Sequence, residues 1–81
     1  MKVRVQMFAL AKQLAGRDVV ELCLGDGASI ADLRRALATE VPALGPILPH
    51  LMFAVDMEYA GDELALSDGA AVACIPPVSG G

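Results

Sequence analysis

Lys2-Val3-Arg4-Val5-Gln6-Met7 is the stretch that decides the fold, because its polar and apolar residues alternate strictly. Successive side chains of a β-strand point to opposite faces, so Val3, Val5 and Met7 share one face and the polar side chains share the other. The pattern predicts a strand with one buried face. Phe8 then falls on the otherwise polar face, where an aromatic side chain can anchor a partner.

The segments that follow this strand predict a short helix, a second strand and a longer helix. A helical run over 9–15 stops at Gly16, and residues 19–24 favour a strand. After a turn at 25–27, Ser29 and Asp32 form a shortened capping box, which marks a helix start. The apolar stripe of this helix has helical spacing and ends before Pro42: Ile30, Leu33, Leu37 and Val41.

The second half of the chain predicts three more strands. Three prolines between 42 and 49 preclude regular structure beyond a turn. Residues 52–57 favour a strand with Phe53, Val55 and Met57 on one side and Ala54 and Asp56 on the other. Turn signals then flank a short strand around Leu64 and Leu66, and a last strand runs over 70–75.

This order of elements predicts an α+β fold with a mixed sheet of about five strands packed on one main helix. Two hairpin-like halves joined by a crossing helix is the order of the ubiquitin-like β-grasp, whereas a ferredoxin-like fold needs a second full helix. We expect a β-grasp domain over residues 1–75 and a flexible tail over 76–81.

Composition and charge narrow the class of protein. A chain of 81 residues that is 56% hydrophobic and 4% aromatic predicts one domain with an aliphatic core. The net charge of −4 disfavours nucleic acid and anionic lipid and favours a basic partner surface. No apolar stretch is long enough to span a bilayer and the chain does not begin with a signal-peptide pattern, so we expect a cytoplasmic protein.

Few residues are of the types that carry metal or nucleophilic chemistry. Cys23 and Cys74 lack Cys-x-x-Cys spacing, and we expect both to be buried as small hydrophobic residues. His50 has no second ligand at metal or catalytic spacing and is expected at the surface. The sequence has no phosphate-binding loop motif, so we expect no bound metal or cofactor.

The chain ends in Pro76-Pro77-Val78-Ser79-Gly80-Gly81, and this tail carries the strongest functional signal. Glycine has no Cβ, so Gly80 and Gly81 can pass as bare backbone through a narrow channel and present the Gly81 carboxylate to a catalyst. The two prolines hold the base of the tail extended. A carboxylate is a poor electrophile at neutral pH, so a nucleotide-dependent partner must activate it.

Residues 68–81, above all their Pro-Pro-Val-Ser-Gly-Gly ending, resemble the C-terminal signature of the molybdopterin synthase sulfur-carrier (small) subunit family of β-grasp proteins. Residues 5–9 and 54–56 resemble the first strand and a central segment of that family. The chain departs from the family pattern at four positions, which concern partner contacts rather than the tail: Asp56, Ala70, Ala71 and Cys74.

The resemblance implies a sulfur carrier. A ubiquitin-activating-like adenylyltransferase would use ATP to adenylate Gly81, and a sulfurtransferase would convert it to a thiocarboxylate. The tail would then enter the large subunit of a heterotetrameric molybdopterin synthase and give sulfur to cyclic pyranopterin monophosphate, with no catalysis by the chain alone. Phe8, Tyr59 and Ile75 resemble the apolar contact patch of the family. The alternatives are a carrier for thiamine, tRNA thiolation or cysteine synthesis, a ubiquitin-like modifier, or a plain interaction module.

Overall fold

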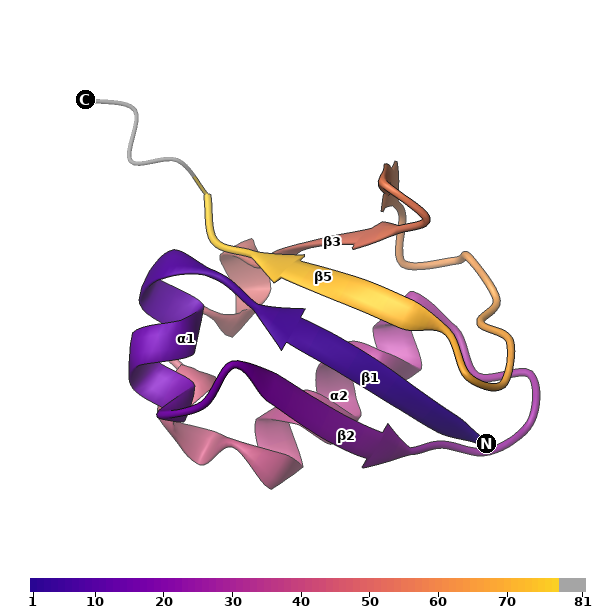
Figure 1. Ribbon diagram of the computed structural model, residues 1–81, viewed down its shortest axis with the longest axis horizontal. Helices are drawn as coiled ribbons and strands as arrows, with labels where there is room; N and C mark the ends of the chain where they lie inside the picture. Colours follow the sequence, from indigo (N-terminus) through magenta and orange to yellow (C-terminus); the bar gives the residue numbers. More distant parts are fainter. Residues whose placement is uncertain (78–81) are drawn as a thin grey trace.

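A computed structural model describes residues 1–77 of the chain, so Val78–Gly81 of the predicted tail lie outside the described residues. One sheet crosses a long helix, with a shorter helix at one end (Figure 1). The elements in chain order are β1 Lys2–Met7, α1 Ala9–Ala15, β2 Val19–Cys23, α2 Ile30–Glu40, the 3-10 turns η1 Pro42–Leu44 and η2 Leu48–His50, β3 Met52–Val55, β4 Glu58–Ala60 and β5 Ala71–Ile75.

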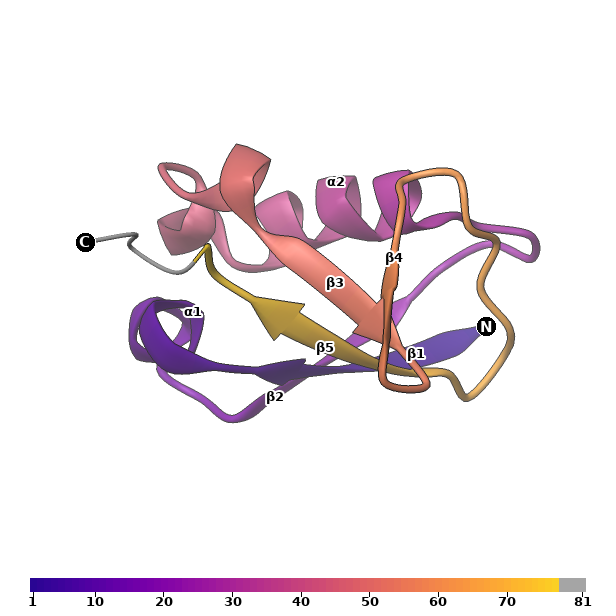
Figure 2. The same ribbon diagram turned by 90° about the horizontal axis from the view of Figure 1, so that it is seen from above.

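The sheet is mixed and has its last strand in the middle. The strand order is β2-β1-β5-β3-β4, with β1 and β5 parallel and the other neighbours antiparallel. Figure 2 shows α2 across one face of the sheet and no helix across the other. The predicted α+β fold, a five-stranded ubiquitin-like β-grasp, is therefore confirmed.

The core lies between the sheet and α2, and its residues come from the faces that the alternation predicted. Val3, Val5 and Met7 are all buried, with at most 1% of their surface exposed. The stripe of α2 packs against them through Ile30, Leu33 and Leu37. Val41 ends the helix, and Leu44 of η1 is also fully buried, which closes the core beside α1.

The start of α2 and the end of α1 lie where the sequence predicted. The Ser29 side chain accepts a hydrogen bond from the Asp32 backbone N–H, and the Ser29 N–H donates to the Asp32 carboxylate at 2.9 Å. This second bond, together with the neighbouring Arg35 guanidinium, lowers the pKa of Asp32. The capping box is confirmed. At the end of α1, Gly16 has a φ of 72°, a left-handed conformation that glycine adopts without strain.

The predicted orientation of Met57 is wrong. β3 ends at Val55, and the next two residues, Asp56 and Met57, have φ of 52° and 68°. Two left-handed residues make the two-residue turn that joins antiparallel strands, and Val55 pairs with Glu58 across it. The alternation of faces stops at this turn, so Met57 is 99% exposed instead of lying beside Phe53.

The predicted short strand around Leu64 and Leu66 is also wrong. In its place β4 comes earlier, at Glu58–Ala60, directly after the turn. Residue Ala65 makes only an isolated bridge to Ser29, and the backbone groups of its neighbours bond to the loop before α2, with Ile30 N–H donating to Leu64 at 3.0 Å. The segment is thus held as a loop against the start of α2.

The two cysteines differ. Cys74 is fully buried on the core face of β5, as predicted, whereas Cys23 is exposed and its prediction is wrong. Val20 and Leu22 occupy the core face of β2, so the alternation puts Cys23 on the outer face. His50 lies exposed in η2, in agreement with a surface position.

Candidate functional site

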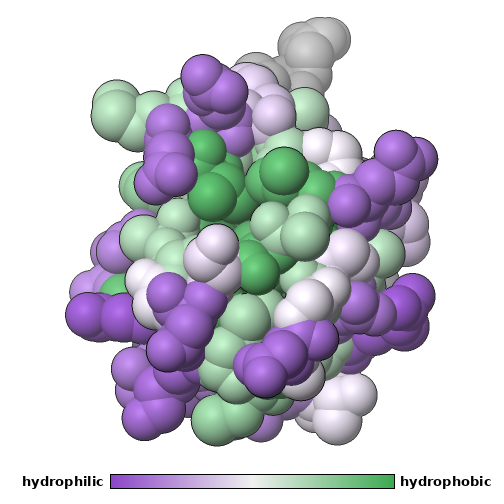
Figure 3. Space-filling view, turned by 90° about the vertical axis from the view of Figure 1, so that its right-hand side faces the viewer, coloured by the Kyte–Doolittle hydropathy of each residue, from purple (hydrophilic) through white to green (hydrophobic). Residues whose placement is uncertain are grey.

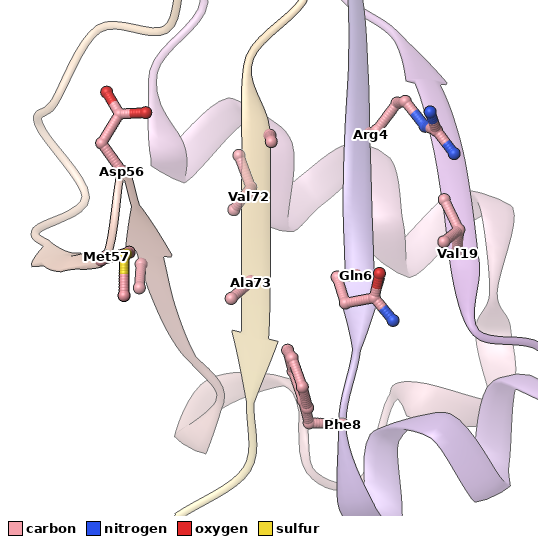
Figure 4. A pocket seen from close by; sticks show the side chains of 10 residues that line it. Arg4, Gln6, Phe8, Val19, Asp56, Met57, Val72 and Ala73 are labelled. Carbon is pink, nitrogen blue, oxygen red and sulfur yellow. The ribbon is translucent and has the colours of Figure 1, made fainter.

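The face of the sheet opposite α2 carries a shallow hollow of about 560 Å³. The register places Gln6 beside Ala73, and Ala73 in turn beside Ala54, so the middle of this face has only small side chains. Longer side chains from the flanking segments rise around it, as Figure 4 shows for Arg4, Gln6 and Phe8 on one side and Asp56 and Met57 on the other. A shallow floor of small side chains, bordered by both polar and large apolar side chains, suits contact with a protein surface.

Phe8 lies where β1 runs into α1, next to the end of β5. Its N–H donates to the carbonyl of Cys74 at 3.2 Å, and its side chain is 44% exposed. Ile75 is partly buried, and it pairs with Met52 of the neighbouring strand β3. The structure thus brings Phe8 and Ile75 to the same end of the sheet and adds the exposed Met52 to them. The sequence signal for Met52 was its alternation with the buried Phe53.

Tyr59, the third predicted contact residue, lies on the edge strand β4. It pairs with Ala54 and is 67% exposed. Tyr59 lines a second hollow, together with Leu64 and Leu66, whereas Phe8 lines the first. The three predicted residues are therefore at the surface, with Tyr59 separated from the other two by β3.

The base of the tail continues β5, the central strand. Pro76 is partly buried and Pro77 is exposed, and both follow directly after Ile75. The remaining predicted channel residues, Val78, Ser79, Gly80 and Gly81, lie outside the described residues. The described part of the site is thus the root of the tail beside Phe8.

Helix α1 adds two apolar side chains at this end of the molecule. Leu10 and Leu14, four residues apart, are both exposed on α1, which contacts β5 (Figure 1). The sequence analysis missed them, although the spacing of four residues places both on one face of the helix. The end of the molecule where β5 stops therefore carries several exposed apolar side chains.

The chemistry available within residues 1–77 is limited. Burial raises the pKa of the Cys74 thiol to about 11, so this cysteine is a protonated thiol at neutral pH and a poor nucleophile. In the same residues, no three His, Cys, Asp or Glu side chains come together as a set of metal ligands. No helix in this part of the chain has the length and apolar character to cross a membrane.

Comparison with known proteins identifies the family. The model of the ThiS family matches residues 5–81. The chain belongs to the ThiS family. This ThiS-family chain is similar to the molybdopterin synthase sulfur carrier subunit of Chlamydomonas reinhardtii, with 40% identity over 83 residues and 100% of both chains covered. The corresponding subunit of Caenorhabditis briggsae is 38% identical over 81 residues, covering 98% of this chain and 96% of the relative.

A solved structure shares the fold. SAMP1 from Haloferax volcanii is 27% identical and superposes with a TM-score of 0.88 over 100% of each chain. The resemblance to the sulfur-carrier family that the tail indicated is confirmed by the relatives, and the β-grasp fold is shared with this structure.

Proposed function

We propose that this ThiS-family chain is the sulfur-carrier subunit of a molybdopterin synthase and carries sulfur as a thiocarboxylate on Gly81. The observation that carries the proposal is the Gly80-Gly81 ending, which follows the central strand of a β-grasp domain. The whole chain is also similar in sequence to a sulfur carrier subunit. The exposed apolar side chains around Phe8 support a role in which partners grip this end of the domain.

The proposed chemistry takes place in partner proteins. A ubiquitin-activating-like adenylyltransferase joins the Gly81 carboxylate to the α-phosphate of ATP and releases pyrophosphate. A sulfurtransferase then supplies sulfur to the acyl carbon, and AMP leaves, so one C–O bond is exchanged for one C–S bond. In the large synthase subunit the thiocarboxylate sulfur is the nucleophile toward cyclic pyranopterin monophosphate; water then cleaves the acyl C–S bond, which leaves the sulfur on the acceptor and returns the Gly81 carboxylate.

The chain itself contributes placement rather than catalysis. β5 is hydrogen-bonded on both sides, so the end of the strand that leads into the tail is fixed, and Pro76 and Pro77 restrict the backbone directly after it. Phe8 and Ile75 would contact the adenylyltransferase and the large subunit alternately. No metal or cofactor is required on the chain, ATP is used by the activating enzyme, and all of these steps suit a cytoplasmic protein.

The test is a reconstitution with the adenylyltransferase, ATP and a sulfur donor. Mass spectrometry should find one tail oxygen replaced by sulfur, and fragmentation should place the change on Gly81. A residue added after Gly81 should abolish the reaction, because misplacing reacting groups by about 1 Å can already cost about a hundredfold in rate. Gly80→Ala should be nearly as damaging if the channel excludes a Cβ.

The same experiment separates the proposed role from its rivals. Addition of the large subunit and cyclic pyranopterin monophosphate should yield molybdopterin. A thiocarboxylate that transfers no sulfur to this substrate would indicate another sulfur pathway, and an isopeptide bond to lysine would indicate a modifier. An extended chain that still supports molybdopterin formation, without trimming back to Gly81, would exclude the carrier mechanism.

A further inference from the structure

A second hollow, of about 590 Å³, lies between the β3–β4 turn and the loop over 61–70. Figure 3 views the molecule from this side and shows an apolar area bordered by hydrophilic side chains. Leu64 is 45% exposed there, and Leu66 is buried. The apolar residues that line the hollow include Val55, Tyr59, Ala60, Leu64, Leu66 and Ala70.

The two charged residues that line this hollow, Asp56 and Glu58, are both acidic. The sequence has no lysine or arginine after Arg35, whereas acidic residues gather between 56 and 68: Asp56, Glu58, Asp62, Glu63 and Asp68. Two of these five have partners, since Arg34 pairs with Asp62 at 2.9 Å and the Lys2 backbone N–H donates to Asp68 at 2.8 Å. In residues 1–77 no ion pair joins Asp56, Glu58 or Glu63 to a basic side chain.

The walls of the hollow are fixed by contacts on both sides. The loop wall is tied to the start of α2, because Ile30 N–H donates to the Leu64 carbonyl at 3.0 Å and Leu66 N–H donates to the Ala28 carbonyl at 2.8 Å. The opposite wall is the β3–β4 hairpin, which pairs with β5 through β3. The hollow is therefore present before any partner binds, so binding requires little loss of conformational entropy in its walls.

We propose that this hollow docks a segment of a second protein in which one or two apolar side chains are flanked by lysine or arginine. The apolar side chains would cover Leu64 and its neighbours, and the basic ones would face Glu58 and Glu63. A second copy of this chain fits less well. Its own apolar and basic segment, α1 with the loop that follows it, already has Lys12 paired with Asp18 at 2.8 Å and Arg17 near Glu40 at 4.0 Å, which offsets its positive charge.

The position of the hollow makes this docking independent of the tail. Figure 1 places the β3–β4 turn and the 61–70 loop at the end of the long axis away from the end of β5. A protein bound here leaves Phe8 and Pro76 accessible, so a partner at each end can be bound at the same time. The inference therefore does not rest on the chemistry proposed for Gly81.

The test is an NMR titration of the isotope-labelled full chain with two synthetic peptides, Lys-Leu-Arg-Leu-Lys and its acidic counterpart Glu-Leu-Asp-Leu-Glu. The basic peptide should shift amide signals of residues 55–70, and less so as salt rises from about 0.05 to about 0.5 M. The double variant Glu58→Lys, Glu63→Lys should bind it about tenfold more weakly. Leu64→Ala should also weaken binding, because it removes apolar contact area.

A matched control isolates the local effect from net charge. The variant Glu21→Lys, Glu40→Lys changes net charge equally at exposed positions outside the hollow, and it should bind the basic peptide like the unchanged chain. A residue added after Gly81 should likewise leave peptide binding unchanged, so a failure of the tail chemistry and a failure of this site are distinguishable. Four results would each overturn the proposal: equal weakening by both double variants, equal binding of the acidic peptide, shifts centred on Phe8, or no shifts at all. Concentration-dependent shifts of 55–70 together with α1, without peptide, would make the occupant a second copy and overturn it as well.

Discussion

Replacing Arg34 by alanine should destabilise the domain more than any other single change of a charged residue on α2. Its guanidinium donates to the carbonyls of Leu48 at 2.8 Å and Leu51 at 2.9 Å, and to the Asp62 carboxylate at 2.9 Å. It also lies 4.9 Å from the ring centroid of Phe53. One side chain thus joins α2 to the segment before β3, to the core and to the 61–70 loop.

The magnitude follows from these contacts. Each bond from a charged donor to a partly buried carbonyl contributes about 1–1.5 kcal/mol after allowance for water that can replace it. The half-exposed Asp62 pair adds about 0.5 kcal/mol and the contact with the Phe53 ring adds about 0.5–1 kcal/mol. The expected loss is about 3–4.5 kcal/mol, which is a large share of the roughly 4–12 kcal/mol expected for a chain of this size.

The assay is urea and thermal unfolding followed by circular dichroism. Arg34→Ala should lower Tm by roughly 15–25 °C, whereas Arg35→Ala should cost less than about 1 kcal/mol, because Arg35 is 73% exposed and its one ion pair within residues 1–77 is with Asp32. Arg34→Lys should fall between them, since an ammonium group cannot match the planar fork of arginine. Equal losses for Arg34→Ala and Arg35→Ala, within about 0.5 kcal/mol, would refute the reasoning.

Three further predictions concern single features of the structure. Phe8→Ala should weaken complexes with both the adenylyltransferase and the large subunit roughly tenfold in a calorimetric titration, with little change in Tm, since Phe8 is half exposed; a loss of several kcal/mol of stability would place Phe8 in the core. The double variant Cys23→Ala, Cys74→Ala should still accept sulfur at its tail in the reconstituted reaction, with a loss of about 1 kcal/mol from the small cavity at Cys74; an obligatory persulfide on either cysteine would contradict this. Ser29→Ala should cost about 1 kcal/mol in urea unfolding. Because the cap lowers the pKa of Asp32, the contribution of this carboxylate is present above about pH 4 and is lost as the pH falls through its folded-state pKa, and unfolding curves at several pH values should show that loss.

The sequence predicted the parts of the fold that depend on local periodicity. Alternation in β1 and the apolar stripe of α2 identified the two surfaces that meet in the core, because each pattern reports which face an element buries. The capping box at Ser29 fixed the start of α2, since its two hydrogen bonds join residues only three apart. Local signals of this kind require no knowledge of the rest of the chain.

Except for Cys23, which the alternation in β2 places on the outer face, the predictions that failed depended on backbone conformation or on distant partners. Met57 follows the strand pattern in sequence, yet a change in the sign of φ at Asp56 ends the strand. The role of Arg34 was missed because two of its acceptors are backbone carbonyls in the segment before β3, which no side-chain pattern reveals. For the candidate site, Phe8 was found from its place on a polar face, whereas Leu10 was missed on a helix too short for a clear periodicity.

The place of β5 in the sheet has a mechanical consequence. A force applied to the C-terminal residues acts along the axis of β5, which is hydrogen-bonded to β1 on one side and to β3 on the other. The hydrogen bonds of these two ladders lie across the direction of the pull, so they share the load and must break together rather than one after another. A pull on the edge strand β4 would instead peel one short ladder from its end. We therefore expect single-molecule pulling to require a higher force through β5 than through β4, which would suit the carrier role proposed for the C-terminal residues.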